Sequence, residues 1–388
     1  MSMALAEIKS KTYKRILGTY SNGLKGPTVV FICGMHGNEP TGLVAFQRVI
    51  DKLNISKNII KGKLVGITGN ISACEAGERF IDKDLNRLWT ADNIMRIIQN
   101  RDTRNYIEAK EQRQLYEAIK PYLDIEGDEK KVFIDLHTTS APSKPYLLIN
   151  DTLKNRRLAQ KFPLPVVLGM EEHLQGTFLN YINDLGHISI GFEAGQHEAN
   201  VSVNNHEALI WQTLLYVGCL PPYDLPDPLK YHYILSKDVD NGKEIYEVRH
   251  RKNVSANEAF AMKPGYINFQ PVKKGEEVAV NNQGPIATLE KGHIFMPLYQ
   301  TKGEDGFFLI RRVRWVWLQL SALLRHTQIH KLLHYLPGVH QCHNMSETLV
   351  VDNRIAKYYV IEFFHLLGFR RKRKIGMYVL FTQRERLG

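Results

Sequence analysis

Short apolar runs alternate with amphipathic helical patterns along the first 220 residues. Strand-like runs lie at 28–33, 63–68, 132–136, 146–149, 166–168 and 188–192. Helical patterns lie at 41–53, 107–120, 151–161, 176–185 and 205–217. This alternation predicts an α/β fold, in which a largely parallel sheet is covered by helices on both faces. Ligands of such sheets bind at the carboxyl ends of the strands.

The pattern changes at the proline-rich stretch 219–228, which we interpret as a domain linker. Short β-like runs separated by Gly and Asn turns follow it, and they predict a small antiparallel β domain. These runs are at 231–235, 244–249, 277–280, 286–289 and 293–297. We therefore expect an α/β domain at 1–220, a β domain at 221–310 and a C-terminal extension at 311–388.

The extension has a different character. Ile310 to Leu324 is apolar with three arginines, which predicts either an amphipathic helix on a membrane surface or a helix packed on the β domain. Residues 355–367 are rich in aromatic residues, 370–374 is a basic run, and 376–381 is strand-like.

Composition is that of a packed globular protein. The chain has 388 residues, of which 44% are hydrophobic and 23% are charged, and this length favours two domains or one large domain with additions. The first 19 residues lack the apolar region of a secretory signal, and no apolar run approaches the roughly 18 to 20 residues of a transmembrane helix. The four cysteines are scattered, which favours free thiols and the reducing cytoplasm.

The positive charge is concentrated at the C-terminal end. The whole chain carries a net charge of +11, and residues 301–388 account for +9 of it. The positive and negative charges of the remaining residues nearly cancel, so the basic character belongs to the C-terminal end and not to the part of the chain before it.

Two histidines and one carboxylate follow the ends of predicted strands. His36 and Glu39 come directly after the strand at 28–33, Gly34 and Gly37 flank the histidine, and His137 follows the strand at 132–136. Each residue alone is more often a surface or capping group. Together they form a His₂Glu set, which binds zinc and leaves a fourth position for water. We expect one Zn²⁺ per chain at these residues, although the ligand types alone do not exclude another divalent metal.

Further polar residues suit acyl chemistry on an anionic substrate. Arg87 offers a bidentate fork for a carboxylate, Asn86 adds directional donors, and Arg79 is a second guanidinium in the same loop. Glu193 lies between glycines near a strand end, where it could act as general base and then as general acid. A solvated loop or an ordinary ion pair would explain any one of these residues alone.

Four motifs, taken in order, carry a family resemblance. They are Gly-x-His-Gly-Asn-Glu, Asp-Leu-Asn-Arg, Asp-Leu-His-Thr-Thr and Glu-x-Gly-Gln-His. In these motifs the chain resembles the succinylglutamate desuccinylase and aspartoacylase family, a branch of the zinc carboxypeptidase superfamily, over roughly 28 to 310. The resemblance implies a carboxypeptidase-like mixed, mostly parallel sheet, followed by a β domain that caps the active site.

The resemblance also implies a role for each site residue. Zinc would be held by His36, Glu39 and His137. The substrate carboxylate would be held by Asn86 and Arg87, while Arg79 steadies the oxyanion and Glu193 is the general base. Tyr299 resembles a tyrosine that the second domain of this family contributes to the pocket.

The chain departs from the family pattern at one position. Aspartoacylases carry a further substrate-binding arginine about ten residues before the catalytic glutamate, which corresponds to the neighbourhood of Asn183. Residues 181–190 contain no arginine. A second substrate carboxylate is therefore unmatched.

The extension offers two additional features. His326, His330 and His334 recur every four residues, which predicts either a second metal site or, with better odds, a helical stripe of partly buried histidines. The basic run 370–374 could contact anionic lipid or nucleic acid, or could simply be a solvated strand end.

We therefore interpret the chain as a zinc-dependent amidohydrolase that removes the acyl group from a small N-acyl amino acid. A carboxypeptidase acting on peptides is the alternative within enzymes. A membrane-associated or nucleic-acid-associated protein, in which the basic extension has the main role, is the alternative outside them. Homo-oligomers are left open by the sequence.

Overall fold

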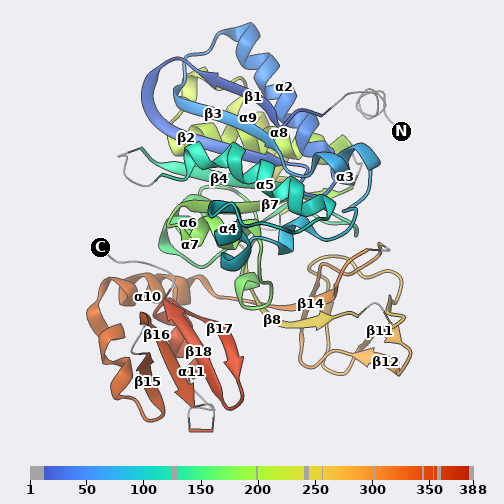
Figure 1. Cartoon of the computed structure of the whole chain (residues 1–388), viewed down its shortest axis with the longest axis vertical. Helices are drawn as coiled ribbons and strands as arrows, with labels where there is room; N and C mark the ends of the chain where they lie inside the picture. The colour runs from blue at the N-terminus through green and yellow to red at the C-terminus, as the bar shows by residue number, and fades with distance from the viewer. Residues whose placement is uncertain are drawn as a thin grey trace.

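The computed structural model describes residues 13–124, 129–197, 200–239, 244–255, 257–300, 302–342, 345–352, 354–355 and 360–383. An 11-stranded sheet dominates this part of the chain (Figure 1), with strand order β1-β3-β2-β4-β7-β5-β6-β8-β14-β13-β10. Neighbours from β3 to β7 pair in parallel, β5 runs antiparallel to β7, and β5, β6 and β8 are again parallel to one another. The predicted mixed, mostly parallel sheet is confirmed for this region.

Most strands of the α/β region agree with the hydrophobic pattern, and one strand before residue 24 was missed. The strands are β1 (Ile16–Ser21), β2 (Leu24–Cys33), β3 (Lys61–Thr68), β4 (Lys131–Thr139), β5 (Tyr146–Ile149), β6 (Val166–Leu168) and β7 (Ile188–Gln196).

Helices cover both faces of the sheet because its central strands are apolar on both sides. Along β2, alternate side chains such as Phe31 and Ile32 enter different cores. One core is closed by α2 (Thr41–Ser56), α6 (Leu153–Ala159), α8 (Asn200–Val217) and α9 (Pro228–Ser236). The other is closed by α4 (Ala91–Ile98), α5 (Ile107–Ile119) and α7 (Phe178–Asp184). The short helix α3 (Ile71–Ala76) follows β3.

The strand predicted at 231–235 is wrong, because α9 occupies these residues. The side chain of Asp227 caps the backbone N–H of Lys230, and Pro228 stands at the start of the helix, where its missing N–H costs nothing. Tyr231 and Leu235, four residues apart, form the buried side of the helix.

The sheet continues into the region expected to cap the site. β8 (Ile245–Asn253) pairs with β6, and the antiparallel strands β14 (Asp305–Arg312), β13 (Gly292–Phe295) and β10 (Pro271–Val272) follow it. A separate three-stranded sheet consists of β9 (Ala261–Met262), β11 (Glu277–Asn281) and β12 (Gly284–Ala287).

The C-terminal extension forms its own antiparallel sheet with helices beside it, drawn in orange and red in Figure 1. Its strands, in the order β15-β16-β18-β17, are β15 (Val339–Cys342), β16 (Met345–Asp352), β18 (Tyr378–Gln383) and β17 (Phe369–Ile375). Its helices are α10 (Trp315–His326), the 3-10 helix η6 (Gln328–Tyr335) and α11 (Val360–Leu366). Within the described residues, no helix has both the length and the apolar character needed to cross a membrane.

The predicted helical stripe of histidines is wrong. α10 ends at His326, and the side chain of Thr327 caps the separate helix η6, so the three histidines do not share one α-helix. His326 and His334 are exposed, and the side chain of His330 lies outside the described residues, as does His343. The described residues contain one group able to hold a metal ion, and it is elsewhere.

A buried ionic cluster joins the extension to the α/β region. The carboxylate of Asp151 accepts hydrogen bonds from Arg156, from Arg325 on α10 at 2.8 Å, and from Arg370 on β17 at 3.1 Å. Arg370 also bonds Glu247 at 2.7 Å and Glu172 at 3.1 Å. Burial alone would raise the pKa of Asp151, but the three guanidinium groups hold it well below its usual value.

This cluster corrects the interpretation of the basic run 370–374. Arg370 is 3% exposed and fully paired, so it belongs to neither a solvated strand end nor a lipid or nucleic-acid contact. The side chains of residues 371–374 lie outside the described residues.

We expect Arg370→Met to reduce the free energy of unfolding by about 3–5 kcal/mol, because it leaves Asp151 and Glu247 buried without their shared cation. Urea denaturation measures the change. Arg96→Met, which removes an exposed pair with Asp92 on α4, is the matched control and should have almost no effect. Equal effects of the two substitutions would show that the cluster does not hold the extension in place.

Candidate metal centre and active site

Three neighbouring parallel strands position the site. His36 and Glu39 lie in the loop between β2 and α2, and His137 lies near the carboxyl end of β4. On the next strand, β7, Glu193 stands directly beside His137 in the parallel register. Glu39 thus meets His137, 98 residues later in the sequence, and Glu193, 154 residues later, at one edge of the sheet, where parallel strands place ligands.

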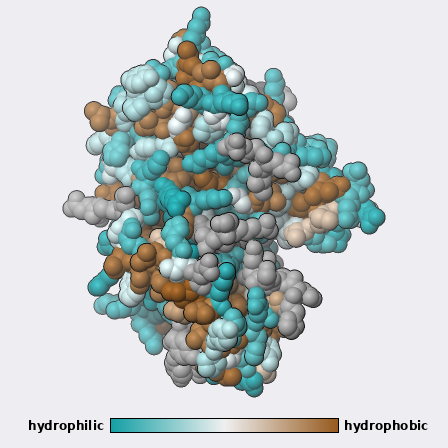
Figure 2. All heavy atoms as spheres, turned by 90° about the vertical axis from the view of Figure 1, so that its left-hand side faces the viewer, coloured by the Kyte–Doolittle hydropathy of each residue, from teal (hydrophilic) through white to brown (hydrophobic). Residues whose placement is uncertain are grey.

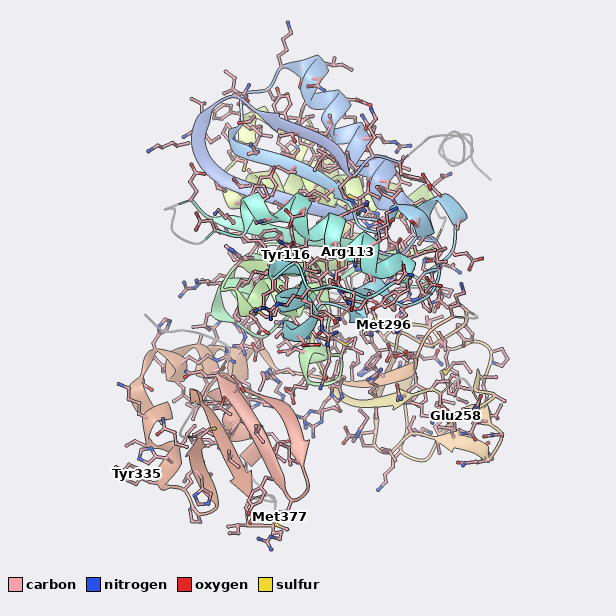
Figure 3. All side chains as sticks on the ribbon, in the orientation of Figure 1. Arg113, Tyr116, Glu258, Met296, Tyr335 and Met377 are labelled. Atoms are coloured by element: carbon pink, nitrogen blue, oxygen red, sulfur yellow. The ribbon has the colours of Figure 1, made fainter. Side chains whose placement is uncertain are left out.

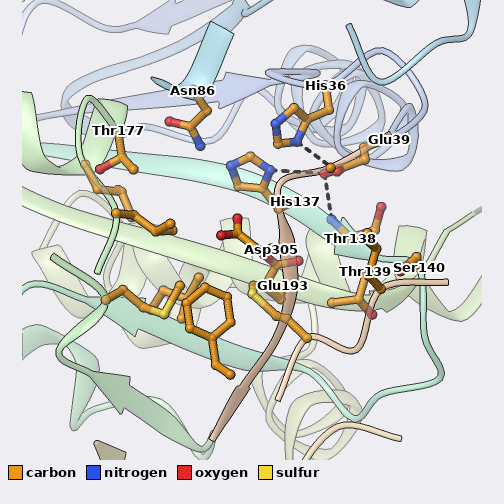
Figure 4. A pocket seen from close by; sticks show the side chains of 18 of the residues that line it. His36, Glu39, Asn86, His137, Thr138, Thr139, Ser140, Thr177, Glu193 and Asp305 are labelled. Atoms are coloured by element: carbon orange, nitrogen blue, oxygen red, sulfur yellow. Dashed lines mark hydrogen bonds and ion pairs between the residues drawn. The ribbon is translucent and has the colours of Figure 1, made fainter. Parts of the chain in front are cut away.

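The predicted metal ligands form a compact buried group (Figure 4). The ligand atoms of His36, Glu39 and His137 all lie within 4.8 Å of one another. The two carboxylate oxygens of Glu39 are 2.9 Å from Nδ1 of His36 and 3.0 Å from Nδ1 of His137. The backbone N–H of Thr138 donates to Glu39 at 2.9 Å. Two imidazoles and one carboxylate converging in this way could hold a metal ion.

Each histidine is oriented by a second carboxylate on its outer side. Nε2 of His36 is 3.2 Å from Asp84, and Nε2 of His137 is 2.9 Å from Asp135. Metal-binding histidines commonly place their second ring nitrogen against a carboxylate, which fixes the tautomer and the ring orientation. In both residues this arrangement leaves Nδ1 to face the metal position.

The electrostatics of the group favour a cation. Burial opposes the charged form of Glu39, but the two histidines outweigh it and hold the pKa of this carboxyl well below its usual value. Burial likewise opposes a charged His137, but Asp135 and Glu39 raise the pKa of the imidazole well above its usual value. A divalent cation bound here would take the place of a proton on the imidazole, as metal binding to histidine generally does.

Glu193 has the opposite electrostatic environment from Glu39. It is 5% exposed. Burial, helped by the nearby negative charge of Glu39, raises its pKa to about 8. Its Oε2 atom is buried and accepts no hydrogen bond from the described residues. Two carboxyl groups whose pKa values are driven apart in one pocket are typical of distinct ligand and acid–base roles.

The predicted anion-binding residues also reach this pocket, and they are already partly paired. Arg79 bonds Asp84 at 3.1 Å and lies 3.7 Å from Glu39. Arg87 donates to Asp305 at 2.8 Å and to the backbone oxygen of Asn86 at 3.0 Å. The Nε atoms of both arginines are buried without a hydrogen-bond partner among the described residues, so each retains a donor for a ligand.

The capping strands close the pocket. Its cavity has a volume of about 140 Å³. Part of its lining comes from the residues that follow β13, which are Met296, Pro297, Leu298 and Gln300. Asn38, in the loop between β2 and α2, donates to Gln300 at 3.3 Å. Met296 lies at the junction between the α/β region and the capping strands (Figure 3). Met296 packs against an apolar part of the lining that includes Leu148, Met170, Leu174, Leu179 and Phe308.

The structure does not bring Tyr299 to the pocket. Its hydroxyl donates to the backbone oxygen of Lys263 at 2.8 Å and accepts from the backbone N–H of Tyr266 at 3.0 Å. These bonds direct the side chain into the capping β region, away from the residues that line the cavity. His197 does line the cavity, and it lies 2.7 Å from the hydroxyl of Thr138.

Three carboxylates were missed in the sequence. Asp135 precedes His137 by two residues, so a strand puts both on one face, and this spacing was a usable signal. Asp84 opens the Asp-Leu-Asn-Arg motif, but nothing in the motif points to His36. Asp305 had no signal, because its partner Arg87 is 218 residues away.

The family model for the succinylglutamate desuccinylase/aspartoacylase catalytic domain matches residues 25–213. A probable aspartoacylase of Prochlorococcus marinus (strain MIT 9215) is 32% identical over 70% of this chain and 87% of its own length. The chain belongs to this family. Its members are hydrolases of the deacylase type, and the predicted family is confirmed.

Other relatives of the family match over shorter spans. A probable aspartoacylase of Acaryochloris marina is 27% identical, and the match spans 50% of this chain and 66% of that protein. Among solved structures, murine aminoacylase 3 is similar with a TM-score of 0.55 at 17% identity, over 74% of this chain and 96% of that one. This likeness establishes the fold, and about a quarter of the present chain lies outside it.

We expect His137→Gln to abolish metal binding, because it removes one of three protein ligands. Metal content after dialysis against zinc should fall from one ion per chain to almost none. Zinc at about a hundredfold above its Kd should stabilise the wild type by about 2.7 kcal/mol and should leave the variant unchanged.

His187→Gln is the matched control, because His187 is also buried but bonds the backbone oxygen of Leu123 outside the site. This variant should keep its metal. Full zinc content in His137→Gln would contradict the assigned ligand set.

Proposed function

We propose that the protein is a zinc-dependent hydrolase that cleaves the amide bond of a small N-acyl amino acid. The observation that carries this proposal is that His137 stands in register with Glu193 on the adjacent strand, and that His36, Glu39, His137 and Glu193 line one pocket. The residues proposed to bind the metal that activates a water, and Glu193, proposed to transfer the proton, would thus lie side by side in the pocket.

The donor set favours zinc. Two imidazoles, one carboxylate and an open fourth position are characteristic of catalytic zinc sites in hydrolases. A zinc ion held there would act as a Lewis acid on the amide carbonyl and would lower the pKa of a bound water.

The residues of the chain then supply proton transfer and charge stabilisation. Glu193, as a carboxylate, takes a proton from the attacking water and, as a carboxylic acid, gives it to the leaving amine. Its raised pKa keeps both forms accessible near neutral pH. The buried Nε–H of Arg79 is available to the oxyanion that develops on the carbonyl oxygen.

Arg87 and Asn86 are suited to hold the substrate carboxylate. Asn86 Oδ1 accepts the backbone N–H of Phe178, so its amide nitrogen is left to donate. Asp305 binds Arg87 on one side and Arg251 on the other, at 2.8 and 2.5 Å. Asp305 is therefore a positioning residue that fixes the orientation of the guanidinium and lowers the net positive charge that a substrate meets.

This pocket favours a substrate with one carboxylate. Among its described lining residues, Arg79 and Arg87 are the guanidinium groups, and both already face carboxylates. Asn183, at the family's additional arginine position, is buried and bonds the backbone oxygen of His187. Apart from the histidines, the other lining residues are apolar, neutral polar or acidic, so a second substrate carboxylate would be buried without a guanidinium or ammonium partner.

The alternative is a carboxypeptidase. The small cavity and the wall formed by residues 296–300 speak against it, because a peptide needs an open cleft. The cytoplasm remains our proposed location, and the free cysteines of the described chain accord with it.

We expect Glu193→Gln to lower kcat by about 100-fold or more while zinc content stays at one ion per chain, because the amide keeps the shape of the side chain but cannot accept and release a proton. Release of free amine from an N-acyl amino acid measures turnover. Glu75→Gln, an exposed change outside the pocket, should match the wild type. Near-normal turnover in Glu193→Gln would exclude this residue as the general base.

We expect kcat/KM for N-acetylleucine or N-acetylphenylalanine to exceed that for N-acetylaspartate and N-succinylglutamate by at least about tenfold. The physical reason is the cost of burying an unpaired second carboxylate. The same amine-release assay compares the substrates, with Glu193→Gln as the blank. Preference for N-acetylaspartate or N-succinylglutamate would overturn the single-carboxylate assignment, and release only from peptides would favour the carboxypeptidase.

A further inference from the structure

Helix α10 turns polar residues towards the protein and apolar residues towards solvent. Its polar residues Ser321 and Arg325 are buried against the protein, where they bond Leu366 and Asp151. Its apolar residues Val316 and Leu323 are 61% and 65% exposed, and Leu320 lies between them on the same side. A helix with an apolar solvent face is normally covered by something else.

The apolar surface continues onto the neighbouring helix η6, which contacts α10. Ile329, Leu332 and Tyr335 on η6 are exposed, and Tyr335 points outward at the lower edge of the extension in Figure 3. Figure 2 faces this side of the molecule and shows apolar atoms gathered in its lower half, over the extension. We call this surface, made of the exposed apolar residues of α10 and η6, the apolar face.

The charge around the apolar face is positive. Residues 311–346 contain no Asp or Glu, whereas they contain five Lys and Arg and five His. Arg311, Arg312 and Arg314 come directly before α10, whose first turn has no acidic residue. Cations at this end oppose the helix dipole, so an anion from outside would be stabilised there.

A cavity beside α10 gathers this charge next to apolar groups. Its volume is about 440 Å³, and Trp317, Leu318 and Leu366 line it together with the three arginines. Arg312 and Arg314 make no ion pair with the described residues, while Glu247 and Glu362, which also line the cavity, are paired with Arg311, Arg370 and Arg249. This mixture suits a phosphate joined to an apolar chain.

We propose that the apolar face docks the protein onto the surface of a bilayer that contains anionic phospholipids. Val316, Leu320 and Leu323 enter the boundary between headgroups and acyl chains, and Arg312 and Arg314 bind lipid phosphates. Trp315 and Trp317 flank the apolar side of the helix at the depth that indole rings favour.

A second copy of the chain is a poorer occupant of this face. A twofold dimer would place the apolar face of one copy against that of the other, together with its arginines and with no acid from residues 311–346. Like charges would then be buried opposite one another, whereas an anionic bilayer neutralises them.

Intrinsic fluorescence offers a direct test with the full chain. The chain has four tryptophans: Trp89 and Trp211 are buried, and Trp315 and Trp317 at the start of α10 are 39% and 50% exposed. Vesicles containing about one third phosphatidylglycerol should therefore shift the emission to the blue, and the protein should float with them. Pure phosphatidylcholine vesicles should bind much less.

The triple variant Val316→Ser, Leu320→Ser, Leu323→Ser should lose flotation and the blue shift. Leu229→Ser with Tyr233→Ser, which removes apolar residues exposed on α9, is the matched control and should bind like the wild type. Unchanged amine-release activity verifies that each variant is folded.

Replacing Arg312 and Arg314 by Gln should weaken partitioning to the anionic vesicles by roughly 25-fold at physiological ionic strength. The matched charge control is Lys57→Gln with Lys61→Gln, at the opposite end of the molecule, and it should have little effect. Binding that ignores the arginines, or no binding to anionic vesicles, would overturn the proposal. Self-association of the wild type that the triple serine variant loses would assign the face to a second copy instead.

Discussion

The parallel alignment of β2, β4 and β7 is the constraint on which the site depends. Because the three strands run in the same direction and are directly adjacent, their carboxyl ends reach one edge of the sheet together. The β4–β7 register then sets His137 beside Glu193. A shift of this register by one residue would turn either side chain to the other face of the sheet and would separate the His36–Glu39–His137 group from Glu193.

Burial gives the two carboxyl groups of the site different properties without any difference in their chemistry. Glu39 is surrounded by two histidines and a backbone donor, so it is held ionised. Glu193 is buried with one oxygen unpartnered, so it is held close to its protonated form. The surrounding sheet keeps this carboxyl group buried although burial disfavours its charged form. Shifted pKa values of this kind are common at active sites.

Local sequence patterns predicted the structural features that depend on residues close together in the chain. The strands that carry the ligands, the helices between them and the His36–Glu39–His137 group follow from periodicity and motif spacing. Tertiary contacts decided the remainder. The apolar run at 231–235 forms a helix, which Asp227 caps, and not a strand. Arg370 belongs to the basic run in sequence, but its side chain is buried among acidic groups. The pairing of Arg87 with Asp305 joins distant strands, which no local pattern reveals.

The three-residue helix η4 (Met170–Glu172) belongs to two parts of the protein at once. Met170 and Glu171 form part of the pocket wall, while Glu172 is bound by Arg370 and by His365 of the extension at 3.1 and 3.0 Å. Ion pairs from the extension thus end on a turn whose two preceding residues line the pocket. Whatever the extension attaches to is mechanically linked, through one short turn, to the volume in which hydrolysis would occur.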